Sequence, residues 1–195
     1  MAVSEERSSQ SSRLAQVWEI NVSRIVYAAL GAALYGGLSY VTNVLQLPGA
    51  GNVSLRPAIV IPLLFAVLFG PLVGLFAGGV GNILGDAISG YGIFWNWDLG
   101  NALIGFIAGL VVLYTFSRYS SRRNIILAEI FSAVGIIIGI VFASYTDIWV
   151  SKYSFQTATL GDLLPAGLSD LVNGLILLPI LLIAYTAAVR RSGRS

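Results

Sequence analysis

Long runs of apolar residues with almost no charge constrain this chain more than any other feature. The runs are Val22–Leu45, Pro57–Ile88, Leu99–Phe116, Ile125–Tyr145 and Leu163–Val189. A helix needs about 20 mostly apolar residues to cross the hydrocarbon core of a bilayer. Only 10% of the residues are charged, against roughly 25% in ordinary soluble domains. The sequence therefore predicts an all-α membrane protein that crosses the bilayer several times.

The run Pro57–Ile88 decides the number of spans, because it is too long for one helix and short for two. Gly70-Pro71 interrupts it, and proline starts a helix well but cannot continue the preceding one. A turn there gives the helices Ala58–Phe69 and Leu72–Ile88, and six spans in all. With six spans, nine of the eleven basic residues lie on the side of the N-terminus. The positive-inside rule then places both termini in the cytoplasm.

The expected organisation is one membrane domain between two tails. Residues 1–20 are expected to form a polar cytoplasmic tail, residues 21–190 a six-helix transmembrane domain, and residues 191–195 a basic cytoplasmic tail. The first of these lacks the basic start and apolar core of a secretory signal.

The composition argues against most catalytic chemistry. The chain has no Cys and no His, which removes thiols, disulfides and the commonest metal ligand and general base. It has no Gly-x-x-x-x-Gly-Lys-Ser/Thr loop for nucleotide phosphates. The intramembrane protease pattern Gly-x-Gly-Asp fails at Ile83, and the Gly-x-Ser-Gly type lacks its His. We therefore expect no enzyme, no catalytic residue, no metal or cofactor, and no nucleic-acid partner.

Polar and aromatic residues gather at the predicted outer ends of the third, fourth and sixth spans. Polar groups at membrane depth are costly, so they should face the interior or a wet cavity. Tryptophans there can stack on a flat ligand while amides and carboxylates bind its edge. The candidate ligand-binding residues are Asn82, Asp86, Trp95, Asn96, Trp97, Asp98, Asn101, Asp170 and Asn173.

Several of these residues also have a purely structural interpretation. Trp95 and Trp97 fit the aromatic belt at a membrane interface. Asp98, with Asn96 as a second choice, fits the N-cap of the fourth helix. Arg56, next to Pro57, fits either an anion-binding role or an anchor for the preceding loop.

Two stripes of small residues run along the first span. Ala28, Ala32 and Gly36 form one stripe, and Ala29 and Ala33 begin the next. Such a smooth surface lets another helix approach closely. The glycines at positions 74, 78, 81 and 85 make a similar ladder on the third span, for which packing inside the bundle is expected.

A set of motifs in this order resembles a known family. The set comprises the Ala-rich first helix, Leu55-Arg56-Pro57-Ala58, Phe69-Gly70-Pro71-Leu72-Val73-Gly74, Gly81-Asn82-Ile83-Leu84-Gly85-Asp86 and Trp95-Asn96-Trp97-Asp98-Leu99-Gly100-Asn101. Together they resemble the substrate-binding S components of energy-coupling factor (ECF) transporters, in particular the riboflavin-type group. The resemblance covers nearly the whole chain after the first tail.

The resemblance implies a function as well as a fold. An S component of a prokaryotic plasma membrane binds a vitamin-like ligand at its outer side. It then docks on a membrane scaffold subunit that carries two ATPases. The docking motif Ala-x-x-x-Ala of the family fits both Ala28/Ala32 and Ala29/Ala33, and the loop Gln46–Arg56 would be the gate over the ligand.

The ligand and one alternative function stay open at the level of sequence. Riboflavin follows from the family label, but thiamine or its pyrimidine part fits the aromatic cluster about as well. The scarcity of basic residues outside argues against a highly phosphorylated ligand. The alternative is a self-sufficient secondary carrier or channel, although the chain shows no convincing inverted repeat.

Overall fold

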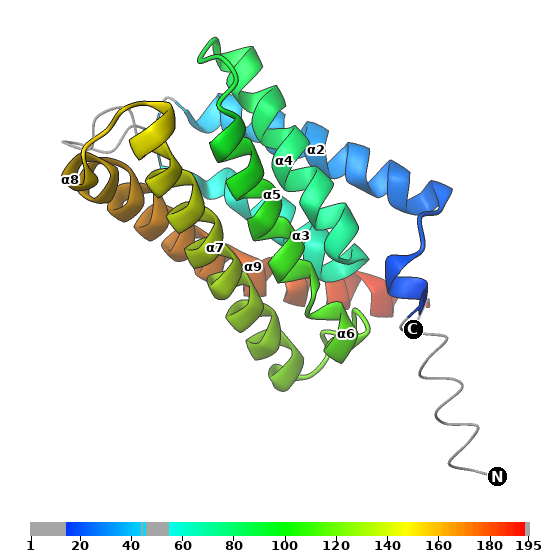
Figure 1. Ribbon diagram of the computed structural model, residues 1–195. Helices are drawn as coiled ribbons and strands as arrows, with labels where there is room; N and C mark the ends of the chain where they lie inside the picture. The colour runs from blue at the N-terminus through cyan, green and yellow to red at the C-terminus, as the bar shows by residue number, and fades with distance from the viewer. Residues whose placement is uncertain (1–14, 44, 46–54, 194–195) are drawn as a thin grey trace.

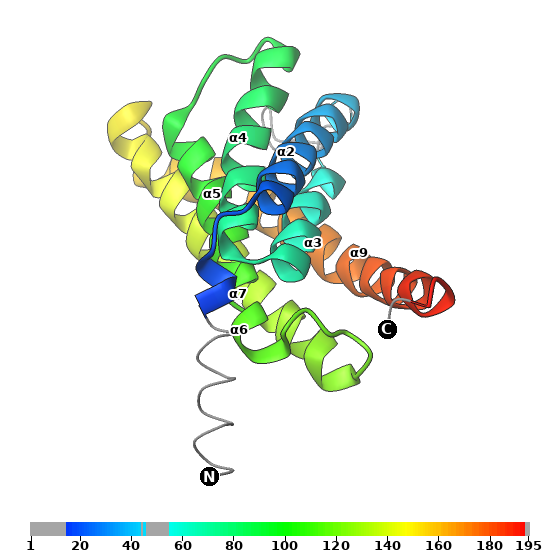
Figure 2. The same cartoon turned by 90° about the vertical axis from the view of Figure 1, so that its right-hand side faces the viewer.

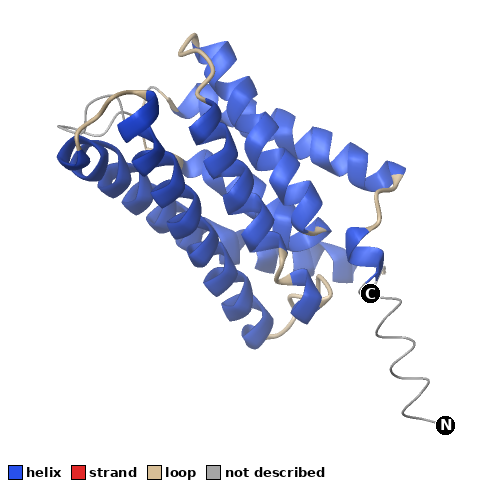
Figure 3. Ribbon diagram, in the orientation of Figure 1, coloured by secondary structure: helices blue, strands red, loops and turns tan. Residues whose placement is uncertain are grey.

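The computed structural model describes residues 15–43, 45 and 55–193, and this part of the chain is helical without a strand (Figure 3). Residues 15–18 form a short helical turn. The predicted gate lies outside the described residues except for Leu55 and Arg56. The elements in chain order are α2 (Val22–Thr42), η1 (Pro57–Ile59), α3 (Val60–Phe69), α4 (Pro71–Ser89), α5 (Trp95–Gly109), α6 (Val112–Thr115), α7 (Arg122–Val150), α8 (Phe155–Thr157), η2 (Ala158–Leu163) and α9 (Leu164–Arg191) (Figure 1).

Five helical segments of the described chain are long and apolar enough to cross a membrane. They are α2, α4, Trp95–Thr115, α7 and Phe155–Arg191. The helix Pro57–Phe69 is apolar but shorter. The prediction of an all-α, multi-pass membrane protein is thus confirmed, while the sixth crossing stays a prediction for this short helix.

The short helix α3 lies inside the bundle. It contacts α2, α4, α5 and α9, and Figure 2 shows it between α2 and α9. Seven of its ten residues are buried. Apolar side chains buried on all sides indicate a core helix, which agrees with the expectation that this segment is enclosed by its neighbours.

The turn between α3 and α4 forms where the sequence predicts it. Gly70 has a φ of 104°, a conformation that costs little only for glycine. Pro71 is the first residue of α4, where its missing N–H needs no partner.

Glycines bring the backbones of α4 and α5 into contact. A Cβ built on Gly74 would overlap the carbonyl of Gly105, and a Cβ on Gly105 would overlap the carbonyl of Gly74. One turn away, Gly78 packs in the same manner on the carbonyl of Asn101. The glycine ladder of α4 therefore serves internal packing, as expected: Gly74 and Gly78 pack on α5, and Gly81 and Gly85 pack on α2.

The apolar surface is distributed as in a protein surrounded by lipid. Large side chains such as Leu63, Ile104 and Leu178 are fully buried between helices. At the same time, Ile137 on α7 and Ile180 on α9 are more than half exposed, and many other large apolar side chains are exposed with them. Lipid tails are an apolar solvent, so such faces are stable in a bilayer.

The predicted capping role of Asp98 and Asn96 is wrong. Helix α5 starts at Trp95, its N-cap is Phe94, and no side chain caps it. Asp98 therefore lies inside the first turn, where its Oδ1 accepts a hydrogen bond from Asn82 Nδ2 at 2.9 Å. The carboxylate of Asp98 thus accepts a hydrogen bond from a side chain of α4 and caps no backbone N–H of α5.

Candidate ligand-binding cavity

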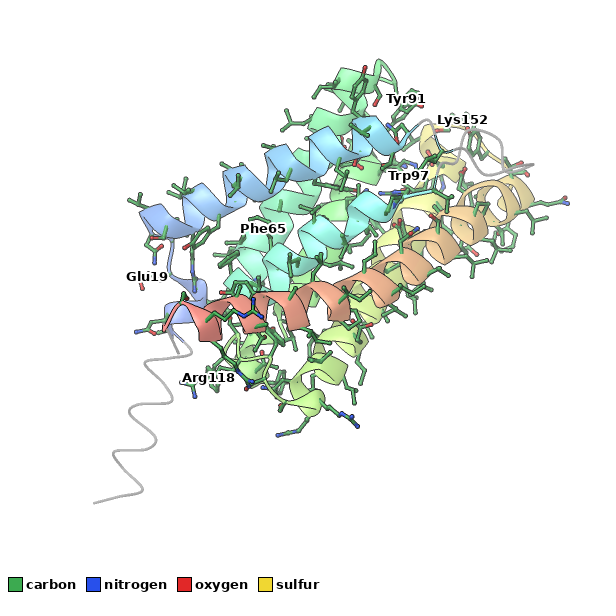
Figure 4. All side chains as sticks on the ribbon, turned by 180° about the vertical axis from the view of Figure 1, so that it is seen from behind. Glu19, Phe65, Tyr91, Trp97, Arg118 and Lys152 are labelled. Atoms are coloured by element: carbon green, nitrogen blue, oxygen red, sulfur yellow. The ribbon has the colours of Figure 1, made fainter. Side chains whose placement is uncertain are left out.

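A cavity of about 600 Å³ opens at one end of the bundle. This volume falls within the range of small-molecule sites, roughly 300–1,000 Å³. Figure 4 shows Tyr91, Trp97 and Lys152 at this end and Glu19 and Arg118 at the opposite one. The lining residues are Tyr35, Ser39, Thr42, Asn43, Arg56, Ala58, Asn82, Asp86, Tyr91, Phe94, Trp97, Asp147, Ser151, Tyr153, Thr157, Gly161, Asp162 and Ala166.

Arg56 connects three helices in the wall of the cavity. Its Nη2 donates to Tyr35 Oη at 2.9 Å and to Asn101 Oδ1 at 2.8 Å. Its Nε lies 3.4 Å from Oδ1 of Asp170, whose side chain is fully buried. The Arg56 backbone N–H also donates to Ser169 Oγ at 3.0 Å. The last residue of the predicted gate is thus tied to α2, α5 and α9.

The charge of Arg56 is stabilised by these contacts. Burial alone would lower the pKa of Arg56, but the negative charge of Asp170 and the contact with Tyr35 outweigh it and hold the pKa above its usual value. Arg56 is therefore a permanent cation, and Asp170 is its counter-ion.

Asn82 lies between two carboxylates on the α4–α5 side of the cavity. Its Nδ2 donates to Asp86 Oδ2 and to Asp98 Oδ1, both at 2.9 Å. Asn82 and Asp86 line the cavity. Asp98 is 6% exposed, and its Oδ2 has no hydrogen-bond partner. One neutral amide is therefore shared by two acids.

Trp97 and Asp147 form a second polar contact, between α5 and α7. Trp97 Nε1 donates to Asp147 Oδ2 at 2.7 Å. The hydroxyl of Ser151 donates to Asp147 Oδ1 at 2.7 Å. The bond holds the indole in place at the cavity wall.

The structure sorts the nine candidate residues into three groups. Asn82, Asp86 and Trp97 line the cavity. Asp98, Asn101 and Asp170 lie directly behind its wall, where they bond to the lining residues Asn82, Tyr35 and Arg56. The remaining three, Trp95, Asn96 and Asn173, do not line it.

Each of the last three side chains has another environment. Trp95 is 55% exposed on the outside of the bundle. Asn96 is fully buried and donates to the carbonyl of Ala143 at 3.1 Å. Asn173 donates to the backbone oxygen and the hydroxyl of Ser169, next to Asp170. Successive residues of a helix point in different directions, so the side chains of Trp95, Asn96 and Trp97 have three different environments. The sequence interpretation had grouped them in one site.

Several lining residues lie outside the sequence-based set. Tyr35 is 1% exposed and donates to Asn101 Oδ1 at 2.8 Å. The available signal was a tyrosine within the small-residue stretch Ala28–Gly37 of α2, a helix that also contains Tyr27 and Tyr40. Asp147 and Asp162 belong to the acids toward the outer side, but nothing in the sequence shows that α7 and η2 approach the α4–α5 cluster.

The fold and the cavity together define a class of protein. It is a multi-pass helical membrane protein with a polar and aromatic cavity of drug-like size at one end of the bundle. Residues 19–187 match the family described as "ECF-type riboflavin transporter, S component". The chain therefore belongs to this family, which is one of transporter subunits rather than of enzymes.

A comparison with curated proteins supports the same placement. A UPF0397 protein of Aliivibrio salmonicida (strain LFI1238) is 31% identical over 134 residues, which cover 66% of this chain and 71% of that protein. No solved structure matches the chain at a significant level.

Proposed function

We propose that this chain is the substrate-capture subunit of an ECF-type vitamin importer. It binds a small, heteroaromatic ligand in the cavity at the outer end of the bundle and then docks on an ATP-driven coupling module. The carrying observation is the cavity of about 600 Å³ whose wall combines Trp97 with hydrogen-bonding groups. A flat heterocycle can stack on the indole while Asn82 and Asp86 bond its edge.

The distribution of charge supports an outward-facing cavity. Arg118 lies in the α6–α7 connection, far from the cavity end (Figure 4), and Arg122 and Arg123 are the first residues of α7. Arg190 and Arg191 are in the last turn of α9. Basic residues favour the cytoplasmic side, so the opposite end faces out. We infer six crossings with both termini in the cytoplasm and residues 1–20 and 191–195 as cytoplasmic tails. Membership of the family supports a location in the plasma membrane of a prokaryote.

The exposure of α2 supports one docking register over the other. Ala28 and Ala32 are buried against the bundle, 8% and 2% exposed. Ala29 and Ala33 are exposed on the outer side of the same helix. A partner helix can reach only an exposed stripe, so Ala29 and Ala33 are the proposed contact with the ECF membrane scaffold subunit and its two ATPases.

Ligand binding by the isolated chain tests the proposal. The full chain is purified in detergent and freed of bound ligand, and its tryptophan fluorescence is titrated with riboflavin, thiamine, the thiamine pyrimidine and related vitamins. We expect saturable quenching by one compound at nanomolar to low-micromolar concentration, because Trp97 lies in the cavity wall. If no compound of the panel quenches the tryptophan fluorescence of folded, ligand-free protein, substrate capture is contradicted. Uptake by cells that contain this chain without any coupling module would instead favour a self-sufficient carrier.

A further inference from the structure

The charges around the cavity are unbalanced. Four charged side chains line it: the cation Arg56 and the acids Asp86, Asp147 and Asp162. The carboxylate of Asp98 lies immediately behind Asn82. Arg56 interacts electrostatically with Asp86, but its ion-pair partner within 4.0 Å is Asp170.

The hydrogen bonds that Asp86, Asp98 and Asp147 accept from side chains in the described part of the chain all come from neutral groups. Asp86 and Asp98 share the amide of Asn82, and Asp147 accepts from an indole and a hydroxyl. The Oδ2 atoms of Asp98 and Asp162 are buried without a hydrogen-bond partner. Arg56–Asp170 is the one ion pair within 4.0 Å among the described residues. Partly buried carboxylates without a counter-charge are costly, and a bound cation would remove that cost.

The aromatic side chains of the cavity suit the same kind of ligand. Tyr91, Phe94, Trp97 and Tyr153 line it together with the acids. The faces of aromatic rings attract cations, and indole is the strongest of them. Aromatic faces also favour a flat, apolar body over a small, strongly hydrated ion.

The spacing of the acids distinguishes an organic cation from a metal ion. No group of three or more acidic side chains converges to hold a metal ion in the described residues. The acids belong to α4, α5, α7 and η2, and they surround a cavity of about 600 Å³. A ligand whose positive charge is spread over a ring, or a ring with several N–H donors, can reach acids on several sides of the cavity. A metal ion, which is a point charge, cannot.

We propose, on the basis of the proposed capture function, that the ligand is a flat organic cation. Its positive ring or its protonated amino group faces Asp86 and Asp162, and its aromatic body stacks on Trp97. The site discriminates against phosphorylated and other anionic ligands, because an anion would lie among carboxylates with a single, already paired arginine. Riboflavin, which is uncharged, would lack the principal attraction.

Matched ligands test the sign of the ligand charge. Titrations of the detergent-purified full chain use thiamine, which carries a cationic ring, thiochrome, its uncharged oxidised form, riboflavin, and riboflavin 5′-phosphate as the anion. A second pair, 1-methylnicotinamide and nicotinamide, differs in the charge of one ring. We expect the cation of each pair to bind at least about tenfold more tightly than its uncharged partner, and the phosphate to bind most weakly, as a close opposite charge in a partly buried site requires.

Substitutions identify the acids responsible. Asp86→Asn and Asp162→Asn keep the shape of the side chain and remove its charge, so each should weaken the binding of the cations about tenfold more than the binding of their uncharged partners. Glu129→Gln is the matched control, because Glu129 is a half-buried acid on α7 that does not line the cavity. Melting temperatures of all three variants show whether they fold.

The outcomes separate this inference from the capture function itself. Preference for the cations, with losses at Asp86 and Asp162 but not Glu129, supports the inference. Tight binding of riboflavin or its phosphate, unchanged in Asp86→Asn and Asp162→Asn, overturns the cationic ligand and leaves substrate capture intact. If no compound of either charge binds, both proposals are wrong.

Discussion

At the scale of single residues, the two tryptophans that flank Asn96 make a matched pair. Trp97 lines the cavity, while Trp95 is 55% exposed on the outside of the bundle. Trp97→Ala should weaken ligand binding by roughly 1–3 kcal/mol, the order of a lost aromatic contact. Trp95→Ala should leave the dissociation constant unchanged. Titration calorimetry of both variants checks this, and equal effects would remove Trp97 from the site.

The pair Arg56 and Asp170 offers a second test at the same scale. Removing either partner leaves a buried charge without compensation, which costs about 3–5 kcal/mol. Arg56→Met and Asp170→Leu should therefore each lower the melting temperature clearly. The double variant should lose much less than the sum of the two single losses. Thermal unfolding in detergent gives the comparison, and strictly additive losses would show that the two side chains are not coupled.

At the scale of helices and turns, the contact between α4 and α5 predicts that Gly105 does not tolerate a larger side chain. Gly105→Ala should destabilise the chain by about 1–3 kcal/mol, because the added methyl group meets the backbone of Gly74 and backbone cannot rotate away. Gly37→Ala is the control, since a Cβ there has nothing within 4 Å. That variant should keep its melting temperature or gain slightly, because alanine favours a helix over glycine. Equal melting temperatures for the two variants would contradict the close contact.

The same scale shows how far sequence reasoning reaches. Gly70-Pro71 acts through local geometry, and the spacing of the glycines along α4 is enough to indicate a face for close helix packing, so both roles could be predicted from the sequence. The role of Asp98 could not, because its partner Asn82 belongs to a different helix. The sequence interpretation grouped Trp95 with Trp97 because the partner of Trp97, Asp147, also belongs to a different helix. The contribution of Tyr35 depends on α2 lying beside α4, which no spacing within α2 reveals.

At the scale of the whole molecule, docking and ligand binding should be separable. Ala33→Trp places a bulky ring on the exposed stripe of α2 and should abolish uptake in cells that contain the coupling module. Its dissociation constant for the ligand should stay unchanged, because Ala33 does not line the cavity. Ile137→Trp is the control, on an exposed apolar face of α7. Uptake that survives in Ala33→Trp would place the docking surface elsewhere.

The whole-molecule view also explains why Ala32 is not the position to test. Ala32 is 2% exposed, and its carbonyl lies against Gly81 of α4. A large side chain there would separate α2 from α4 and disturb the fold itself. A loss of uptake in such a variant would therefore say nothing about a partner.

The contact of bare backbone between α4 and α5 has a mechanical consequence. Two helices whose carbonyls and Cα atoms touch cannot slide or rotate past each other without collision, so this pair behaves as a rigid frame. The frame carries Asn82, Asp86 and Trp97, three residues of the cavity wall. The cavity wall also includes η2, where the helix widens to a π-helical turn at Ala158–Leu163, a form that is frequent at functional sites. We therefore expect any widening of the cavity for ligand exchange to come from the segments opposite α4 and α5. Asn82, Asp86 and Trp97 keep their positions relative to one another while those segments move.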